Sequence, residues 1–321
     1  MRHLKAAIVL TFALLLCSCR GLGAPSRTGP EAFGAGSWQR EAATAISDVM
    51  ANLDVDKGAT DLLVLTNAGY GSVDGESTQV LTDIAMHKTG CTMGKGSLLL
   101  VHAPESAPLW FVLFRGDTYR AVFAKWTQEA FQRQMLNLHP THILEPEGWE
   151  DAGAGLVGGN LFQVASFCLV WSADPPWGLL KSAELHNHIC PGVNAGYVVA
   201  RYIRQRFPLR KGEQYVLVSA PPACPVDALQ TVLDCTAGKR SMFTMQVSEQ
   251  TLAGHGFKGV MPVVIAMRVN READTCDGVV LGFDWERVEE IMDKLAEEVN
   301  EIKQASSQQE KADEFGDLLF T

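Results

Sequence analysis

The chain has 321 residues, a formal net charge of −10 and a sequence pI of about 5.3. Its length is sufficient for two ordinary domains, each with its own hydrophobic core. The acidic balance, without a basic run or basic residues interleaved with aromatic ones, argues against a nucleic acid as partner. No apolar run in the sequence reaches the length that spans a bilayer.

Residues 1–19 have the organisation of a bacterial lipoprotein signal peptide. A short basic segment precedes an apolar run at residues 6–16, which is too short to span a bilayer and typical of a signal peptide. The letters Leu-Cys-Ser-Cys then end at Cys19 and resemble a lipobox, which implies cleavage before Cys19 and a lipid on its thiol. Because Arg20 is not an inner-membrane retention signal, we expect an outer-membrane anchor facing the periplasm, with a flexible tether over residues 20–36. The alternative is ordinary signal-peptide cleavage after Ala24, in front of Pro25.

Apolar periodicity predicts alternating helices and strands in the first half of the chain. We expect helices at residues 37–53 and 77–88, and strands at residues 62–66, 98–102 and 109–115. A turn-rich loop with the letters Cys-Thr-Met-Gly-Lys, at residues 91–95, separates the second helix from the second strand.

The connection between the two halves has a less regular pattern. It predicts a helix at residues 121–137, a loop at residues 139–160 and an apolar strand at residues 161–171. The loop contains the letters G-x-G-x-x-G at residues 153–158, but no strand precedes them. We therefore expect no dinucleotide site there.

The most informative stretch reads His-Asn-His-Ile-Cys-Pro-Gly at residues 186–192. Proline suits the first position of a helix and pushes the preceding residue towards extended geometry, so Cys190 should cap a helix. If the approach to it is extended, alternation places His186, His188 and Cys190 on one side. Imidazole and thiolate are the ligands that zinc prefers, and the helix N-terminus favours the thiolate. A bend at Cys190 would admit only one of the two histidines.

A second cysteine-proline step repeats this device at Cys224. Asp227 falls in the first turn of the helix that follows, where it could support a thiolate or orient a histidine from behind. The letters Cys-Thr-Ala-Gly-Lys then place Cys235, Thr236 and Lys239 in a glycine turn. We expect Cys224 to join the metal site and these later residues, with Asp227, to contact a bound ligand. Whether Cys235 also reaches the metal stays open, because a continuous helix would separate it from Cys224 by about 15 Å.

The three ordered motifs H-x-H-x-C-P-G, C-x-V-D-A-x-Q and C-T-x-G-K resemble the FmdE family, named for the E subunit gene of formylmethanofuran dehydrogenase operons. The resemblance covers roughly residues 177–300 and implies a metal-binding α+β protein with an α-β-α-β-β-β core. It does not imply formylmethanofuran dehydrogenase activity, because the chain has no molybdopterin or iron–sulfur motif. Further predicted elements are helices at residues 191–206, from 225 and at 285–304, and strands at residues 215–219, 242–247 and 263–270.

Both halves read helix, strand, helix, C-T-x-G-K loop and further strands, which predicts an internal duplication. The expected fold is therefore α+β, a duplicated α-β-α-β-β-β unit whose mixed sheets are flanked by helices, similar to the FmdE/GAPDH-like domain. Residues 37–171 would be a degenerate copy without the metal donors, residues 172–304 the metal-binding copy, and residues 305–321 a polar tail. A duplicated chain could build internally the dimer that single-unit relatives form, so we expect a monomer.

These observations favour a mononuclear site, expected to hold zinc, formed by His186, His188, Cys190 and Cys224. An open position would bind a small anionic or sulfur-containing molecule, and whether the protein transforms that molecule stays open. One alternative is a non-enzymatic metal carrier, sensor or adaptor. Another is thiol–disulfide chemistry between Cys190 and Cys224, since cysteines in an oxidising periplasm often form disulfides.

Overall fold

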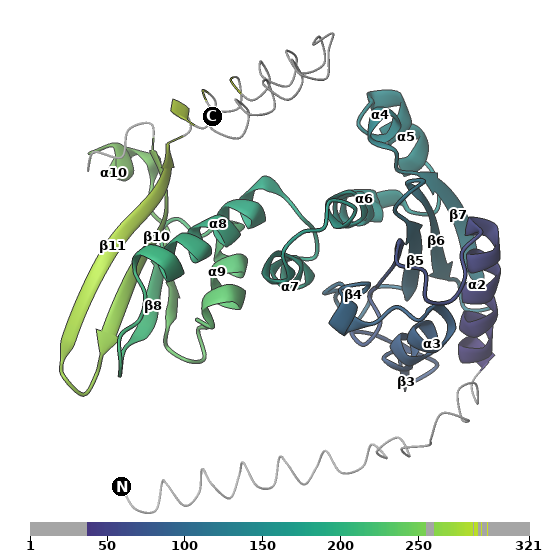
Figure 1. Cartoon of the computed structure of the whole chain (residues 1–321), viewed down its shortest axis with the longest axis horizontal. Coiled ribbons are helices and arrows are strands. Elements are labelled where there is room, and N and C mark those ends of the chain that lie inside the picture. Colours follow the sequence, from purple (N-terminus) through teal and green to yellow (C-terminus); the bar gives the residue numbers. More distant parts are fainter. Residues whose placement is uncertain (1–36, 255–259, 285, 288–289, 291–293, 295–321) are drawn as a thin grey trace, which may run out of the picture.

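The computed structural model describes residues 37–254, 260–284, 286–287, 290 and 294 (Figure 1). The predicted signal peptide, tether and polar tail, and most of the predicted helix at residues 285–304, lie outside the described residues. Within the described part of the chain, no helix combines the length and apolar character needed to cross a membrane.

The first half forms a five-stranded sheet in the order β4-β1-β5-β6-β7. Strand β1 pairs in parallel with β4 and antiparallel with β5, and the remaining neighbours are antiparallel. Helices α2 and α3 cover one face and α4 to α6 cover the other, so the sheet is buried on both sides (Figure 1). The bounds are α2 (Ser37–Leu53), β1 (Leu62–Thr66), α3 (Val80–Thr89), β4 (Leu98–Leu100), β5 (Trp110–Arg115), β6 (Arg120–Trp126), β7 (Phe131–Asn137), α4 (Pro140–Ile143), α5 (Pro146–Gly153) and α6 (Leu161–Trp171), with a small hairpin of β2 (Ser72–Val73) and β3 (Glu76–Ser77) and short 3₁₀ turns η3 (Met93–Lys95) and η4 (Gly158–Asn160).

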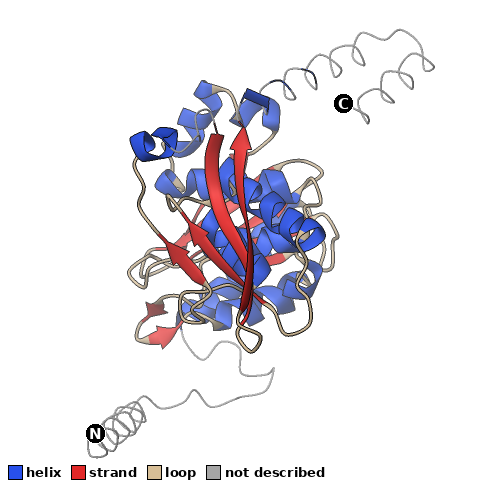
Figure 2. Cartoon of the chain, turned by 90° about the vertical axis from the view of Figure 1, so that its left-hand side faces the viewer, coloured by secondary structure: helices blue, strands red, loops and turns tan. Residues whose placement is uncertain are grey.

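The second half forms a four-stranded sheet in the order β11-β10-β8-β9, with β8 and β9 parallel. Helices α8 and α9 pack on one face, and Figure 2 views the sheet from the other face. The bounds are α7 (Trp177–His186), α8 (Pro191–Arg206), β8 (Gln214–Ser219), α9 (Pro225–Leu233), β9 (Met242–Thr244), α10 (Glu249–Gly254), β10 (Val260–Asn270) and β11 (Thr275–Asp284). The predicted mixed α+β class with helix-flanked sheets is confirmed.

The predictions for the connection between the halves were wrong. Residues 121–137 form strands β6 and β7. The apolar residues of β6 are buried on both faces of the sheet and therefore show no strand-like alternation, whereas β7 is mostly polar and partly exposed. The segment expected as a loop contains α4 and α5, each opened by a proline in its first turn. The segment expected as a strand is helix α6, whose buried Leu161, Val164, Ala165 and Cys168 have helical spacing.

Four strands of the first sheet, in the order β4-β1-β5-β6, match the second sheet, β9-β8-β10-β11, in order and register, and β7 has no counterpart among the described residues. Val64 pairs with Leu98 in the first sheet as Leu217 pairs with Met242 in the second. Each C-T-x-G-K loop also has the same position: the Cys91 thiol donates to the Leu62 carbonyl at 3.3 Å, and the Cys235 thiol donates to the Tyr215 carbonyl at 3.6 Å. The outer faces of the two sheets differ in burial. Matching positions are fully buried in the first sheet and exposed in the second, as the exposed fractions of three pairs show: Leu99 0% against Phe243 49%, Val112 0% against Ile265 36%, and Phe123 0% against Val280 53%.

Helix α7 lies between the two halves (Figure 1). Leu180 and Ala183 belong to the core under the first sheet, whereas Leu179 packs with residues of α8 and α9. Glu184 fastens the helix to the edge strand β4: its carboxylate accepts the Leu100 N–H at 2.9 Å, and its carbonyl accepts the His102 N–H at 3.0 Å. The helix is therefore held by the first half while its last residue faces the second.

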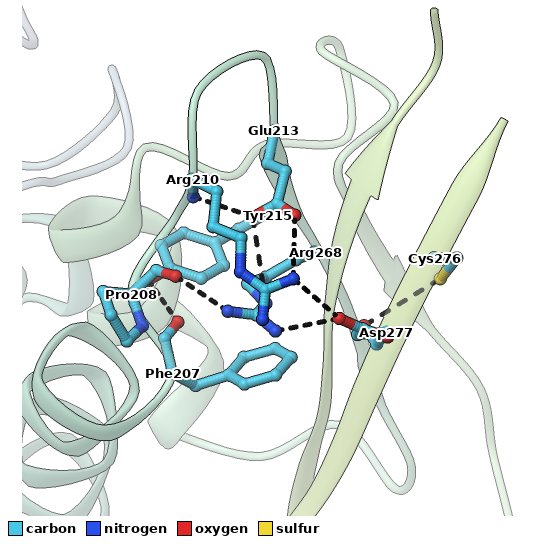
Figure 3. A network of polar contacts seen from close by, with 8 residues as sticks. All are labelled: Phe207, Pro208, Arg210, Glu213, Tyr215, Arg268, Cys276 and Asp277. Carbon is cyan, nitrogen blue, oxygen red and sulfur yellow. Dashed lines mark hydrogen bonds and ion pairs between the residues drawn. The ribbon is translucent and has the colours of Figure 1, made fainter. Parts of the chain in front are cut away.

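A buried arginine links α8 to the second sheet (Figure 3). Arg268 on β10 donates to the Pro208 carbonyl at 3.0 Å and to the Asp277 carboxylate on β11 at 2.9 Å. Its guanidinium lies 4.0 Å from the centre of the Phe207 ring, and its Nε lies 3.9 Å from the Glu213 carboxylate. The Arg268 and Glu213 side chains are each only 9% exposed, so the charges compensate one another away from water.

Candidate metal centre

Three helix ends meet at one point in the second half of the chain. His186 is the last residue of α7, Cys190 is the N-cap of α8 and Cys224 is the N-cap of α9. One donor atom from each lies within 4.8 Å of the other two, and all three side chains are half-buried. Elsewhere among the described residues, no second group of three such donors is found.

The loop between α7 and α8 brings two of these donors together. Asn187 adopts a left-handed conformation with φ of 66°, which ends α7 directly after His186. Cys190 is extended, with φ of −127° and ψ of 167°, and Pro191 then begins α8 as predicted. The expectation that residues 186–190 are extended throughout was wrong, because α7 continues to His186 and a left-handed residue follows it.

Two glycines of α8 allow α9 to approach closely. A Cβ at Gly192 would lie 2.6 Å from Cys224 Cβ and 3.4 Å from its sulfur, and a Cβ at Gly196 would lie 2.4 Å from the Pro225 carbonyl oxygen. Side chains at either position would therefore force the helices apart. Gly192, which follows the first cysteine-proline step, therefore allows Cys224 to lie close to Cys190.

Asp227 orients the histidine of this cluster. Its Oδ2 lies 2.7 Å from His186 Nδ1, while His186 Nε2 lies 3.8 Å from Cys190 Sγ. Gln230 approaches the other carboxylate oxygen at 3.4 Å. A carboxylate on one ring nitrogen fixes the imidazole tautomer and leaves the other nitrogen free to bind a metal. Of the three roles that the sequence suggested for Asp227, support of a thiolate, orientation of a histidine and contact with a bound ligand, the geometry contains the second.

The thiol of Cys224 is held in its neutral form. Burial, followed by the neighbouring Cys190 thiol, raises the pKa of Cys224 above its usual value. The sequence suggested the opposite direction from the helix N-terminus, but desolvation and the second sulfur outweigh the helix dipole. A cation between the two sulfurs would reverse this balance, because metal binding requires and stabilises the thiolate.

His188 stands beside the cluster and outside it. Its Nδ1 lies 2.9 Å from the Asn187 side-chain oxygen, and its ring centre lies 4.4 Å from that of His186. Burial, followed by the charge of His186, lowers the pKa of His188. A neutral imidazole is thus placed next to the three donors.

The C-T-x-G-K residues are not brought to this centre. Cys235 follows α9, a helix of nine residues that spans about 13 Å, whereas Cys224 precedes it. The Cys235 thiol is buried against the start of β8, and the Thr236 N–H donates to the Ser241 hydroxyl at 3.1 Å. Lys239 forms an exposed ion pair with Asp234. These residues shape the loop at the far end of α9.

Sequence reasoning missed a row of rings that leads to the cluster. Trp149 on α5 lies 6.4 Å from Phe162 on α6, and Phe162 lies 5.2 Å from His188, measured between ring centres. His188 in turn packs on His186. The sequence did not predict this contact, because residues 139–171 were expected to form a loop and a strand, and Trp149 and Phe162 were therefore not placed on helices.

A cavity of about 620 Å³ lies apart from the metal centre, at the junction of the first sheet with the start of α7. Lys95, Trp171, Asp174 and Trp177 contribute to its wall, and none of the three metal donors does. Its size therefore has no bearing on the chemistry of the cluster.

Comparison with known proteins places the cluster in a family domain. The protein-family model described as "FmdE, Molybdenum formylmethanofuran dehydrogenase operon" matches residues 185–320, which include all three donors. The chain is also 37% identical, over 62 residues, to the nucleoside triphosphate pyrophosphohydrolase/pyrophosphatase MazG of Thermotoga maritima. That similarity is local, because it spans 19% of this chain and 24% of the relative. Residues 185–320 of the chain thus form an FmdE family domain.

Proposed function

We propose that the protein binds a divalent metal ion, zinc, through His186, Cys190 and Cys224, and presents it to a small molecule. The observation that carries this proposal is the convergence of the three donors within 4.8 Å. The chemistry of the donor set fits zinc, which prefers imidazole and thiolate ligands. A zinc site with three protein ligands leaves a fourth position for water or an anionic or sulfur-containing molecule, the arrangement found in catalytic sites.

The residues around the donors are suited to proton transfer. Zinc, when bound, supplies Lewis acidity and lowers the pKa of a coordinated water. Asp227 would hold His186 in the tautomer that binds through Nε2. His188, neutral because of its lowered pKa, could accept a proton from a molecule beside it or close the site as a fourth ligand.

Two other functions use the same residues. A carrier, sensor or adaptor would bind the metal without transforming a ligand. A thiol–disulfide protein would use Cys190 and Cys224, both of which are free thiols in this structure. The paired histidine and carboxylate favour the metal function, because a disulfide needs neither.

Metal analysis of the full chain, purified without a histidine tag, tests the proposal. We expect about one zinc ion per chain, lost in Cys190→Ser because a hydroxyl does not replace a thiolate ligand. Cys91→Ser is the matched control, since Cys91 is also a free thiol but lies in the first half. Full zinc occupancy in Cys190→Ser would refute the assignment, and a stoichiometric Cys190–Cys224 disulfide without metal would favour the redox function.

We further propose that the two halves arose by duplication and that the first lost its donors. The matching strand orders and the equivalent Cys91 and Cys235 loops support this proposal. The family match, in contrast, covers only the second half. An experimental structure in which the two loops occupy non-equivalent points of their sheets would contradict a duplication.

For the location of the protein, we propose a periplasmic lipoprotein anchored through Cys19. The basic and apolar N-terminal residues and the lipobox-like ending support it. Mass spectrometry of the N-terminus should find a diacylglyceryl group on Cys19. An unmodified N-terminus at Pro25 would rule out the anchor.

A second candidate function rests on the local similarity to a nucleoside triphosphate pyrophosphohydrolase. Beyond residue 294 the sequence has three carboxylate pairs three positions apart, Glu298 with Glu301, Glu310 with Asp313 and Glu314 with Asp317. Carboxylates are the ligands that Mg²⁺ uses when it presents a substrate phosphate. Release of pyrophosphate from nucleoside triphosphates by the full chain, dependent on Mg²⁺ and retained in Cys190→Ser, would support this activity. No release above a blank would refute it.

A further inference from the structure

The row of rings at the metal centre is assembled from three separate segments. Trp149 belongs to α5, Phe162 to the first turn of α6 and His188 to the loop after α7. Their successive centre-to-centre distances, 6.4 Å and 5.2 Å, fall within the range in which aromatic rings attract one another. The loop before α8 is tied to α6 as well, because the Ile189 N–H donates to the Ser166 hydroxyl at 3.1 Å. The rings are therefore held in place by the backbone around them.

Phe162 is the most exposed member of this row, since Trp149 and His188 are half-buried. Its side chain is 48% exposed, whereas the large apolar residues Leu161, Val164 and Phe167 of the same helix are at most 3% exposed. A phenylalanine ordinarily gains stability by burial, so a half-exposed ring fixed between Trp149 and His188 leaves apolar surface uncovered. That surface begins one ring away from His186.

The distances limit what could cover Phe162. A ligand atom at the fourth position of a zinc ion lies about 2 Å from the metal. His188 is packed on His186 at 4.4 Å and on Phe162 at 5.2 Å. Only two ring contacts thus separate the metal donor His186 from Phe162, and a compact ligand, with its ring joined to the metal-binding group by one or two bonds, matches that short span.

We propose that the small molecule bound at the metal centre is an aryl compound, with an anionic or sulfur-containing head on the metal and its ring stacked on Phe162. This inference rests on the proposed zinc function and adds the substrate class to it. Phe162 then determines specificity, and Trp149 holds the Phe162 ring in place.

Two probes with one head group test the inference on the zinc-loaded full chain: benzohydroxamate and acetohydroxamate. Aromatic pairing and apolar burial together predict about tenfold tighter binding of the aryl probe, measured by calorimetry. Phe162→Leu keeps an apolar side chain without a ring and should reduce this preference to about threefold or less. Phe162→Ala should abolish it, and the zinc content of both variants should equal that of the wild type. Phe243→Ala removes an exposed ring on the second sheet and should leave the preference unchanged.

Equal affinities for the two probes in a wild-type protein that binds zinc normally would overturn the aryl assignment and leave the zinc function intact. An undiminished preference in Phe162→Ala would also overturn it. Failure of the wild type to bind zinc would refute the proposed function, and the aryl assignment with it.

Discussion

Replacing Asp227 with asparagine should weaken zinc binding without destroying the site. Asparagine keeps the size of the side chain and an oxygen that can face His186 Nδ1, now 2.7 Å from the carboxylate. It removes the negative charge that strengthens this hydrogen bond. Outer-shell carboxylates of this kind contribute about 10- to 100-fold in metal affinity. Because the Asp227 side chain is 34% exposed and partly screened by water, we expect the lower end, about tenfold or ~1.4 kcal/mol.

Competition with a chromogenic zinc chelator at fixed pH measures this loss. Asp234→Asn is the control, because that carboxylate is 82% exposed and pairs with Lys239 at the far end of α9. Asp227→Ala should weaken binding further, towards a hundredfold, since His186 then loses its orienting partner altogether. An affinity of Asp227→Asn within twofold of the wild type would refute the orienting role. A loss as complete as that of Cys190→Ser would equally refute it, because Asp227 would then be a ligand.

Three further outcomes follow from the structure. Phe123→Ala should lower the free energy of unfolding by about 3–5 kcal/mol and Val280→Ala by less than ~1 kcal/mol, because only Phe123 is fully buried; denaturant titration giving the reverse order would contradict this. Arg268→Met should cost about 3 kcal/mol by the same measurement, since the Glu213 carboxylate loses its buried counter-charge and keeps only contacts with Arg210, and an unchanged midpoint would argue against that network. Zinc affinity should rise between pH 6 and pH 8, because the raised pKa of Cys224 keeps its thiol protonated until the metal displaces the proton, and a flat profile would contradict thiolate ligation.

Local signals in the sequence predicted the two helices that follow the cysteine donors, but not α7, which ends at His186. The helix expected at residues 191–206 is present with those bounds, because proline starts it and nothing interrupts its apolar period. The strand expected at residues 62–66 is likewise confirmed. Strand β11 gave no such signal, since its ten residues are mostly exposed and include two glycines. Within residues 121–171, burial on both faces removed the alternation of β6, whereas α6 keeps a helical spacing of its buried residues and was nevertheless predicted as a strand.

The sequence predicted which residue types form the metal site, but it did not predict much of the geometry of that site. Two cysteines in front of prolines indicated two helix starts, and both are present at Cys190 and Cys224. The left-handed conformation of Asn187 could not be inferred, although it separates His186 from His188 and decides which of them faces the sulfurs. The contact of Phe162 with His188 depends on how α6 packs against the loop after α7, which no local pattern contains.

The position of α7 links the metal centre to the solubility of the chain. Strand β4 is the edge of the first sheet, and an uncovered edge offers free backbone groups for pairing with another chain, which leads to aggregation. Glu184, two residues before the histidine that ends the same helix, accepts the Leu100 N–H of this edge and the His102 N–H just beyond it. A movement of α7 away from β4 and towards the second half would expose that edge. The same helix therefore carries a metal donor and protects the first half against self-association.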